Sequence, residues 1–203
     1  LPAANCNLLT MASQRIAVIG STGQLGTDLV EVLRLDDKSE TLPVSHADCD
    51  CTNANQAGEI LRQMHPDVVI NCAAYVRVDD CEDHMSEAFQ VNAIGALNVA
   101  RACATVDALC VYISTDYVFD GVKGSPYVES DRPCPINVYG ASKLAGEHLV
   151  RQAAPHSLIV RTSSLFGKTA EPSLKGRPIQ ATAPQRRLHS HPRATAILFT
   201  SSC

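Results

Sequence analysis

Short apolar runs alternate with amphipathic stretches along most of the chain. Five runs rich in valine, isoleucine and leucine are typical of buried strands, and they lie at residues 15–19, 41–45, 68–72, 109–113 and 157–160. Helical spacing of apolar residues follows the first run from Leu25 to Leu33 and recurs near 55–64, 85–104 and 137–153. Strands that alternate with helices pair in parallel through right-handed crossovers. The pattern therefore predicts an α/β fold built on a doubly wound parallel sheet.

The alternation stops near residue 167. Residues 168–203 carry six Lys or Arg, a single acidic residue and four prolines, with no apolar period before the run from Ala194 to Thr200. Such composition is typical of a poorly packed or disordered appendage. We expect one domain over residues 12–167, an atypical basic tail over 168–203 that is not an independent domain, and an N-terminal extension over 1–11.

Composition limits the class of protein. The chain has 203 residues, 45% hydrophobic content, a mean hydropathy of −0.01 and a net charge of −4. These values are typical of a soluble globular protein and give no electrostatic reason to expect nucleic acid as a partner. No apolar run approaches the ~20 residues of a membrane span, and the N-terminus lacks a secretory pattern. We expect a cytoplasmic protein without a membrane partner.

The nine cysteines do not form a recognisable metal or disulfide pattern. They are scattered singly through strand-like and helix-like segments, where a free cysteine behaves as a small buried hydrophobe. Their odd number argues against a complete disulfide set. Cys49 and Cys51 stand too close together for the usual zinc spacing, and the histidines are dispersed. We predict no metal site.

A glycine-rich turn follows the first apolar run. Gly20, Gly23 and Gly26 stand where a strand ends and a helix begins, so they permit a tight turn, close approach of a pyrophosphate to the backbone, and close helix packing. The helix N-terminus would add free N–H groups and a favourable dipole. A plain strand-to-helix turn is the alternative interpretation. In this context the motif favours a dinucleotide site.

Tyr139 and Lys143 stand four residues apart in a predicted helix. Residues at this spacing share one helix face, and a lysine beside a phenol lowers its pKa from about 10. Such a pair suits proton transfer during carbonyl reduction. A surface tyrosine beside a solvated lysine is the alternative if the pair stands alone.

Two further strand ends carry suitable groups. Ala73 and Ala74 follow the third strand and are small enough for a cofactor to lie against the backbone, although close helix packing would also explain them. Thr115 ends the fourth strand, where its hydroxyl could hydrogen-bond a substrate carbonyl. The aromatic rings just after it, Tyr117 and Phe119, either pack against a substrate or belong to the core.

Together these segments resemble the dTDP-4-dehydrorhamnose reductase family of the extended short-chain dehydrogenases/reductases. The resemblance covers about residues 14–167. Its residues are Gly23-Gln24-Leu25-Gly26, Pro66 to Asn71, Ala73-Ala74-Tyr75, Val78-Asp79, Val91-Asn92-Ala93, Ser114 to Gly121, Pro126-Tyr127, Tyr139 to Glu147 and Arg161-Thr162-Ser163. The string from Ser114 to Gly121 is the most specific of these, whereas the glycine loop and the Tyr139–Lys143 spacing are shared across the superfamily.

The resemblance implies an NADPH- or NADH-dependent enzyme that reduces the C4 ketone of a dTDP-4-keto-6-deoxy sugar. Thr115, Tyr139 and Lys143 would be the catalytic residues: Thr115 orients the carbonyl, Tyr139 protonates the developing alkoxide, and Lys143 holds the nicotinamide ribose and lowers the pKa of Tyr139.

The same resemblance assigns the binding residues. The cofactor would be held by Gly20, Gly23, Gln24, Leu25 and Gly26 at the pyrophosphate, Asp50 and Cys51 at the adenine, Ala73, Ala74 and Tyr75 on the ribose and nicotinamide side, and Tyr139 and Lys143. The nucleotide-sugar would contact Thr115, Asp116, Tyr117 and Phe119. Asn92 would brace the active-site helix rather than touch the ligand.

Three departures limit what the resemblance implies. Ser45 and His46 replace the acidic or arginine residue that usually closes the second strand, which makes strict NAD preference doubtful and NADPH acceptance plausible. Ser164 stands where the family commonly has a tryptophan beside the substrate. The small substrate-binding domain of the family is not recognisable after Gly167, so we expect cofactor binding to survive better than turnover.

Two expectations follow from relatives in the wider family. A noncatalytic NADP-binding module, similar to the regulatory subunit of methionine adenosyltransferase, is the alternative function. The stretches 85–104 and 137–153 form the dimer face in the wider superfamily, so a homodimer is an expectation by analogy, although their apolar stripes would serve a core equally well.

Overall fold

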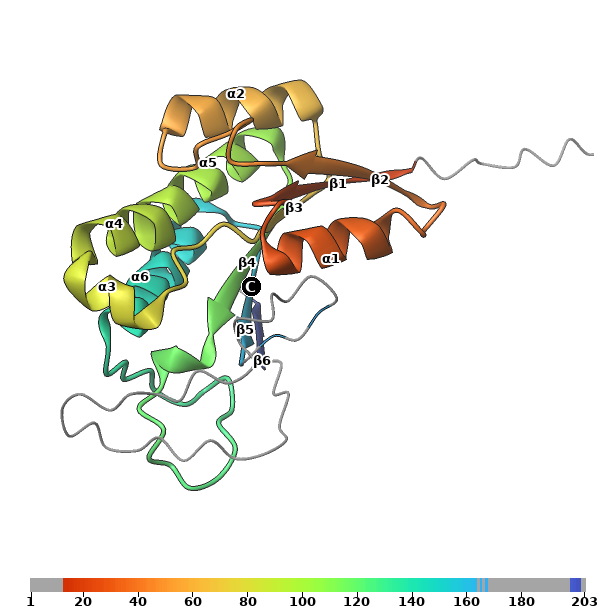
Figure 1. Ribbon diagram of the computed structural model, residues 1–203. Helices are drawn as coiled ribbons and strands as arrows, with labels where there is room; N and C mark the ends of the chain where they lie inside the picture. Colours follow the sequence, from red (N-terminus) through yellow and green to blue (C-terminus); the bar gives the residue numbers. More distant parts are fainter. Residues whose placement is uncertain (1–12, 164, 166, 168–197, 202–203) are drawn as a thin grey trace, which may run out of the picture.

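The computed structural model describes residues 13–163, 165, 167 and 198–201. Its sheet has the strand order β2-β1-β3-β4-β5-β6 (Figure 1). The strands are β1 (Gln14–Ile19), β2 (Ser39–Val44), β3 (Val68–Asn71), β4 (Leu109–Thr115), β5 (Ser157–Thr162) and β6 (Leu198–Ser201). The first five are parallel, which confirms the predicted doubly wound parallel sheet, whereas β6 pairs antiparallel with β5 at the edge. The sequence did not predict β6, and the rest of the expectation for residues 168–203, like that for residues 1–11, lies outside the described residues.

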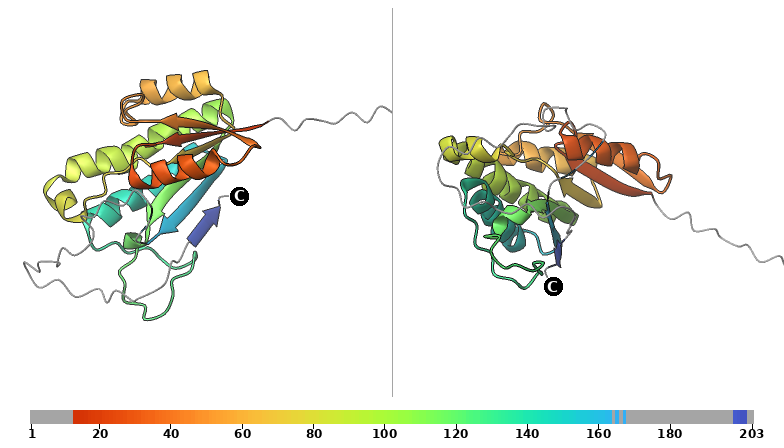
Figure 2. Two further views of the ribbon diagram at one scale, coloured as in Figure 1. Left: turned by 45° about the vertical axis from the view of Figure 1, so that its right-hand side comes forward. Right: turned by 60° about the horizontal axis from the view of Figure 1, so that its bottom comes forward.

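The helices cover both faces of this sheet. They are α1 (Gln24–Leu33), α2 (Ala54–Met64), α3 (Val78–Asp83), α4 (Met85–Phe89), the π-helical turn η1 (Gln90–Gly95), α5 (Ala96–Val106), the 3₁₀ turn η2 (Asp116–Val118) and α6 (Val138–Ala153). The chain runs from β1 outward to β2 and then back across β1 to β3, so right-handed crossovers place α1 and α2 on opposite faces. Helices α2, α5 and α6 pack side by side on one face, and α1 lies on the other (Figures 1 and 2).

The central strands are buried because helices cover both their faces. Ala17, Val18 and Val69 are fully enclosed, and Val99 and Ala100 of α5 pack against this core. Parallel strands in such a position read as continuous apolar runs rather than alternating ones. This is why the first and third strands are easy to find in the sequence.

The predicted helix over 85–104 is interrupted in the structure. It consists of α4, η1 and α5, and the wider π-helical turn contains Asn92, which is fully buried. The hydroxyl of Tyr112 in β4 donates to the Asn92 carbonyl oxygen over 2.8 Å. A side chain that takes over a backbone acceptor is one cause of such a break in a helical ladder. The break aims the Asn92 side chain at the loop after β3.

Candidate functional site

The turn after β1 and the loop after β3 meet at the point where the strand connections diverge. Gly20 has φ +77, and a Cβ there would lie 2.9 Å from the backbone nitrogen of Ala73. A Cβ on Gly26 would overlap the carbonyl oxygen of Gly20. Open α/β sheets bind ligands at such a switch point, outside the carboxyl ends of the strands. The glycines therefore let the two loops pack closely at this switch point, which we call the glycine cradle because a dinucleotide would lie against it in such a fold.

The N-terminus of α1 faces this cradle. Gly23 is its N-cap and has no side-chain cap hydrogen bond, and the first-turn N–H groups of an α-helix in general have no carbonyl partner inside the helix. The positive end of the helix dipole adds to them, as a pyrophosphate requires. The Gln24 amide also donates to the carbonyl oxygen of Leu165 over 3.1 Å.

The turn after β2 differs from the sequence expectation. No carboxylate was expected there, but the Asp48 side chain folds back onto Ser45 and accepts from its hydroxyl over 2.6 Å. Asp50 accepts from the Thr52 N–H and hydroxyl over 2.9 and 2.8 Å, and these bonds lower the pKa of Asp50. Cys51 is buried, which raises the pKa of its thiol to about 11. The Cys51 side chain therefore faces the interior, and the adenine role of Asp50 and Cys51 stays a prediction.

The loop after β3 is held by Asn92. The Asn92 side chain accepts from the Tyr75 N–H over 2.8 Å, donates to the Tyr75 carbonyl oxygen over 3.0 Å, and donates to the Ser142 hydroxyl of α6 over 2.9 Å. Asn92 thus ties the loop after β3 to α6, as a bracing residue would, while its expected lack of contact with the ligand stays a prediction. The loop residues Ala73, Ala74 and Tyr75 remain partly exposed.

A hollow of ≈ 350 Å³ opens beside this loop. Its lining residues are Ala74, Tyr75, Val76, Arg77 and Asp80. The Tyr75 hydroxyl donates to Asp80 over 2.6 Å, and this hydrogen bond raises the pKa of Tyr75 to about 12. Another hollow, of ≈ 210 Å³, lies between α2 and α5 and is lined by none of the predicted site residues.

The three predicted catalytic residues come together at the end of β4 and the start of α6. Thr115 is the last residue of β4, and its hydroxyl donates to Asp116 Oδ1 over 3.2 Å while lying close enough to the Tyr139 phenol to lower the pKa of that phenol. Asn137 caps α6 by accepting from the Gly140 N–H over 2.7 Å, which fixes the first turn that carries Tyr139. Lys143 lies one turn further along the helix. All three residues thus lie at the junction of β4 and α6, as their order in the sequence predicts.

The pKa values at this group differ from the sequence expectation. Burial raises the pKa of Tyr139 to about 12, with the Thr115 hydrogen bond acting against it. Burial lowers the pKa of Lys143 to about 7, and Glu147 acts against that shift. The net shift of the Tyr139 pKa is upward because burial dominates it, and the expected lowering by Lys143 stays a prediction. The physical reason is that both groups lie in a desolvated interior, which disfavours phenolate and ammonium alike.

Lys143 is enclosed more completely than the sequence suggests. It is 2% exposed, and its Nζ lies 4.2 Å from the centroid of the Tyr112 ring. An aromatic face attracts an ammonium and so favours the charged form against desolvation. Tyr112 was not predicted as a site residue, because a tyrosine inside a strand carries no signal of what lies over its ring.

The predicted substrate residues are placed differently from one another. Tyr117 is 37% exposed, and its ring meets that of Tyr139 edge-on with centroids 5.7 Å apart. Asp116, the neighbour of Tyr117 in the chain, is also exposed, yet the surrounding protein desolvates its carboxyl enough to raise its pKa. Phe119 is 4% exposed and stacks on Tyr127 at 4.1 Å. The burial of Phe119 favours its interpretation as a core residue rather than a substrate contact.

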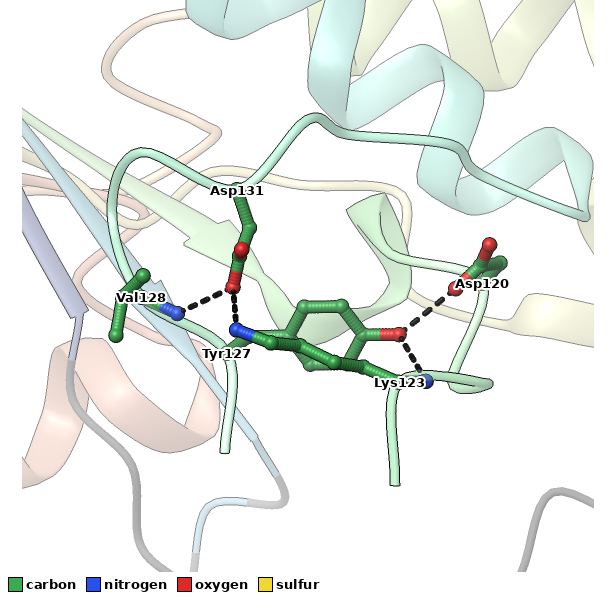
Figure 3. A network of polar contacts seen from close by, with 5 residues as sticks. All are labelled: Asp120, Lys123, Tyr127, Val128 and Asp131. Atoms are coloured by element: carbon green, nitrogen blue, oxygen red, sulfur yellow. Dashed lines mark hydrogen bonds and ion pairs between the residues drawn. The ribbon is translucent and has the colours of Figure 1, made fainter. Parts of the chain in front are cut away.

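The loop between β4 and α6 is fixed by its own side chains. The Tyr127 hydroxyl donates to Asp120 over 2.7 Å and accepts from the Lys123 N–H over 3.3 Å (Figure 3). The Asp131 carboxylate accepts from the Val128 N–H over 2.7 Å and pairs with the Lys123 ammonium. These contacts hold the Tyr127 ring where it stacks on Phe119.

A buried ion pair ties α6 to the sheet beneath the site. Arg161 of β5 makes a two-pronged contact with Glu147 of α6 at 2.8 and 2.6 Å, and the Ser114 hydroxyl donates to Glu147 over 2.6 Å. The Arg161 guanidinium also lies 5.0 Å from the Phe119 ring centroid. Glu147 and Arg161 belong to the family strings in the sequence, but their mutual contact could not be read there.

The described residues contain no group of three or more His, Cys, Asp or Glu side chains that could hold a metal ion. In the same part of the chain no helix is long and apolar enough to cross a membrane. The seven described cysteines are free thiols. Ser164 lies outside the described residues, so the structure does not bear on the missing tryptophan.

Residues 14–182 match the family model described as the RmlD substrate binding domain. The chain belongs to this family. It is 41% identical over 160 residues to a protein named dTDP-4-dehydrorhamnose reductase from Mycolicibacterium smegmatis, covering 78% of this chain and 48% of that one. It is 38% identical over 157 residues to a dTDP-4-keto-6-deoxy-D-glucose reductase of Streptomyces niveus, covering 77% and 54%.

Solved structures of RmlD-family proteins agree with this assignment. A dTDP-4-dehydrorhamnose reductase from Bacillus anthracis in complex with NADP superposes with a TM-score of 0.75 at 44% identity, covering 77% of this chain and 55% of that one. An orthologue from Clostridium acetobutylicum gives a TM-score of 0.74 at 41% identity, with 76% and 55% covered. The chain thus spans about half the length of the relatives that it matches.

Proposed function

We propose that this RmlD-family chain binds NADPH or NADH and carries the catalytic residues for reducing the C4 ketone of a dTDP-4-keto-6-deoxy sugar. The observation that carries the proposal is that Thr115 and Tyr139 lie together, with Lys143 one helical turn further along, at the same carboxyl edge of the sheet as the glycine turn. The names of the matched relatives, dTDP-4-dehydrorhamnose reductase among them, support this substrate class and a role in dTDP-rhamnose biosynthesis. The predicted homodimer stays a prediction.

The residues would divide the work as follows. A bound reduced nicotinamide supplies the hydride. Tyr139 supplies the proton to the carbonyl oxygen, and its pKa of about 12 keeps the phenol protonated at neutral pH, as a proton donor requires. Thr115, which lies beside the same phenol, would orient the carbonyl. Lys143 follows Tyr139 on the same helix, and its pKa is lowered to about 7. Its amine therefore gains or loses a proton near neutral pH.

Turnover can be tested directly. The purified chain is mixed with NADPH or NADH and dTDP-4-dehydrorhamnose, and cofactor oxidation is followed by absorbance while cofactor binding is measured separately by fluorescence. We expect oxidation that Tyr139→Phe abolishes and that Tyr127→Phe, a matched loss of one phenol outside the catalytic group, retains. Intact cofactor binding without oxidation above the Tyr139→Phe level would overturn the reductase function and leave the noncatalytic module.

A further inference from the structure

The turn over residues 45–48 lies directly beside the glycine loop. Val44, the last residue of β2, pairs with Ile19 of β1, and its carbonyl oxygen accepts from the N–H groups of Gly20 and Ser21 over 2.9 and 3.1 Å. Ser45 therefore follows at the carboxyl edge of the sheet, next to the cradle. In dinucleotide folds this position meets the 2′-oxygen of the adenosine ribose.

The Ser45 hydroxyl already donates its proton to the Asp48 carboxylate. Asp48 Oδ2 accepts from the Ser45 hydroxyl over 2.6 Å and from the Ser45 N–H over 2.9 Å. These hydrogen bonds lower the pKa of Asp48, so its carboxylate is ionised at neutral pH. A hydroxyl has a single proton to donate. Ser45 Oγ also accepts a long hydrogen bond of 3.4 Å from the Asp48 N–H, so the remaining lone pair of its oxygen can only accept from an incoming group.

An acceptor of this kind distinguishes a hydroxyl from a phosphate. A ribose 2′-hydroxyl can donate to Ser45 Oγ, whereas a 2′-phosphate near neutral pH carries close to two negative charges and mainly accepts. The phosphate would also meet the Asp48 carboxylate. His46 is the one basic side chain within the turn, and its charge acts on Asp50, whose pKa it helps to lower.

We propose that Asp48, acting through Ser45, makes this chain favour NADH over NADPH. The inference rests on the proposed dinucleotide function and adds a specificity-determining residue to it. The position could not be found from the sequence, because Asp48 stands three residues beyond the expected place and reaches the site only through the turn.

The test compares dissociation constants for NADH and NADPH, two cofactors that differ only in the 2′-phosphate. Asp48→Asn keeps an oxygen that can accept from Ser45 but removes the charge. We expect the ratio of the NADPH to the NADH dissociation constant to fall about fivefold, because the variant removes the repulsion between the carboxylate and the 2′-phosphate. Asp107→Asn is the matched control, because Asp107 is an exposed aspartate that ends α5 before β4 begins, at the opposite edge of the sheet.

A second variant guards against a change in folding. Ser45→Ala removes the accepting oxygen, and we expect it to weaken NADH binding more than NADPH binding while circular dichroism stays unchanged. An equal ratio in Asp48→Asn, Asp107→Asn and the unmutated chain would overturn the inference alone. Failure of the unmutated chain to bind either cofactor would overturn the proposed function and this inference with it.

Discussion

Lys143 lies behind Tyr112, inside the protein, on the same helix face as Tyr139. Burial shifts the pKa of Tyr139 up and that of Lys143 down, so near neutral pH the phenol is protonated and the amine is partly neutral. The sequence predicts which groups would take part, because their spacing on one helix face is local. It does not give their charge states, because these depend on how completely other elements enclose them.

The lowered pKa of Lys143 predicts a pH-dependent stability. Unfolding restores the ordinary pKa of 10.5, so between about pH 7 and that value the unfolded chain holds a proton that the folded chain has lost, and stability rises with pH. Lys143→Met fills the same space without a titrating group. We expect the wild type to gain stability relative to Lys143→Met between about pH 7 and 8.5, measured by urea unfolding.

The difference between the two proteins is the decisive quantity in that measurement. The buried thiols of Cys51 and Cys72 have raised pKa values and weaken folding as pH rises, and Lys143 lowers both values, so its removal changes them. Their effect on stability grows only as the pH approaches 9.0, the ordinary thiol value, so the comparison is confined to the range from about pH 7 to 8.5. Parallel pH profiles for wild type and variant would show that Lys143 has no lowered pKa in the folded chain.

Helix α6 and the π-helical turn η1 approach each other more closely than side chains normally allow. A Cβ on Gly146 would overlap the carbonyl oxygen of Asn92 and lie 2.5 Å from the Tyr112 hydroxyl. The hydrogen bond between those two groups would have to move with it. The sequence predicts one helix over 85–104, because a one-residue change in hydrogen-bond register leaves the apolar spacing almost unaltered. The close contact of Gly146 with Asn92 and Tyr112, which lie on other elements, shows why glycine is required at this position.

Two glycine-to-alanine variants separate this contact from helix propensity. Gly146→Ala should destabilise the fold by about 1–3 kcal/mol through overpacking. Gly58→Ala in α2 meets only the flexible end of Arg62, at 3.3 Å, and should stabilise by about 0.5–1 kcal/mol, since alanine is the better helix former. Thermal unfolding of both variants is the measurement. Equal effects of the two substitutions would contradict the close approach at Gly146.

The whole molecule places its site where the chain changes direction across the sheet. The turn after β1 leads to α1 on one face, and the loop after β3 leads to α4 and α5 on the other, so the two backbones separate beside Gly20 and Ala73. The glycine cradle is formed jointly by the turn after β1 and the loop after β3, so its position follows from the order of the strands in the sheet. A substitution that forces these loops apart should therefore affect binding more than folding.

Gly20→Ala tests this arrangement. The new Cβ would lie 2.9 Å from the Ala73 nitrogen at a φ of +77, and we expect at least about a tenfold loss of NADH affinity, equivalent to about 1.4 kcal/mol. Gly124→Ala is the matched control, because Gly124 has φ +70 but nothing within 4 Å of its Cβ position. It carries the same backbone strain without the contact, so an equal loss of affinity in both variants would contradict the prediction.

The sequence by itself determined the parallel strands, the glycine turn and the order of Thr115, Tyr139 and Lys143. These features depend on residues adjacent in the chain or one helical turn apart, so local pattern is enough to find them. The same holds for Asn92, whose bracing role followed from a family string and is met by its contacts with Tyr75 and Ser142.

The tertiary structure alone decided which groups are charged and which are covered. It enclosed Lys143 behind Tyr112, buried Phe119 beneath Tyr127, brought Glu147 to Arg161, and folded Asp48 back onto Ser45. Desolvation and hydrogen bonding act over a few ångströms in space, whereas most of these partners stand many residues apart in the chain. For that reason the residues of the site could be named from the sequence, while their protonation and the cofactor preference that we infer required the fold.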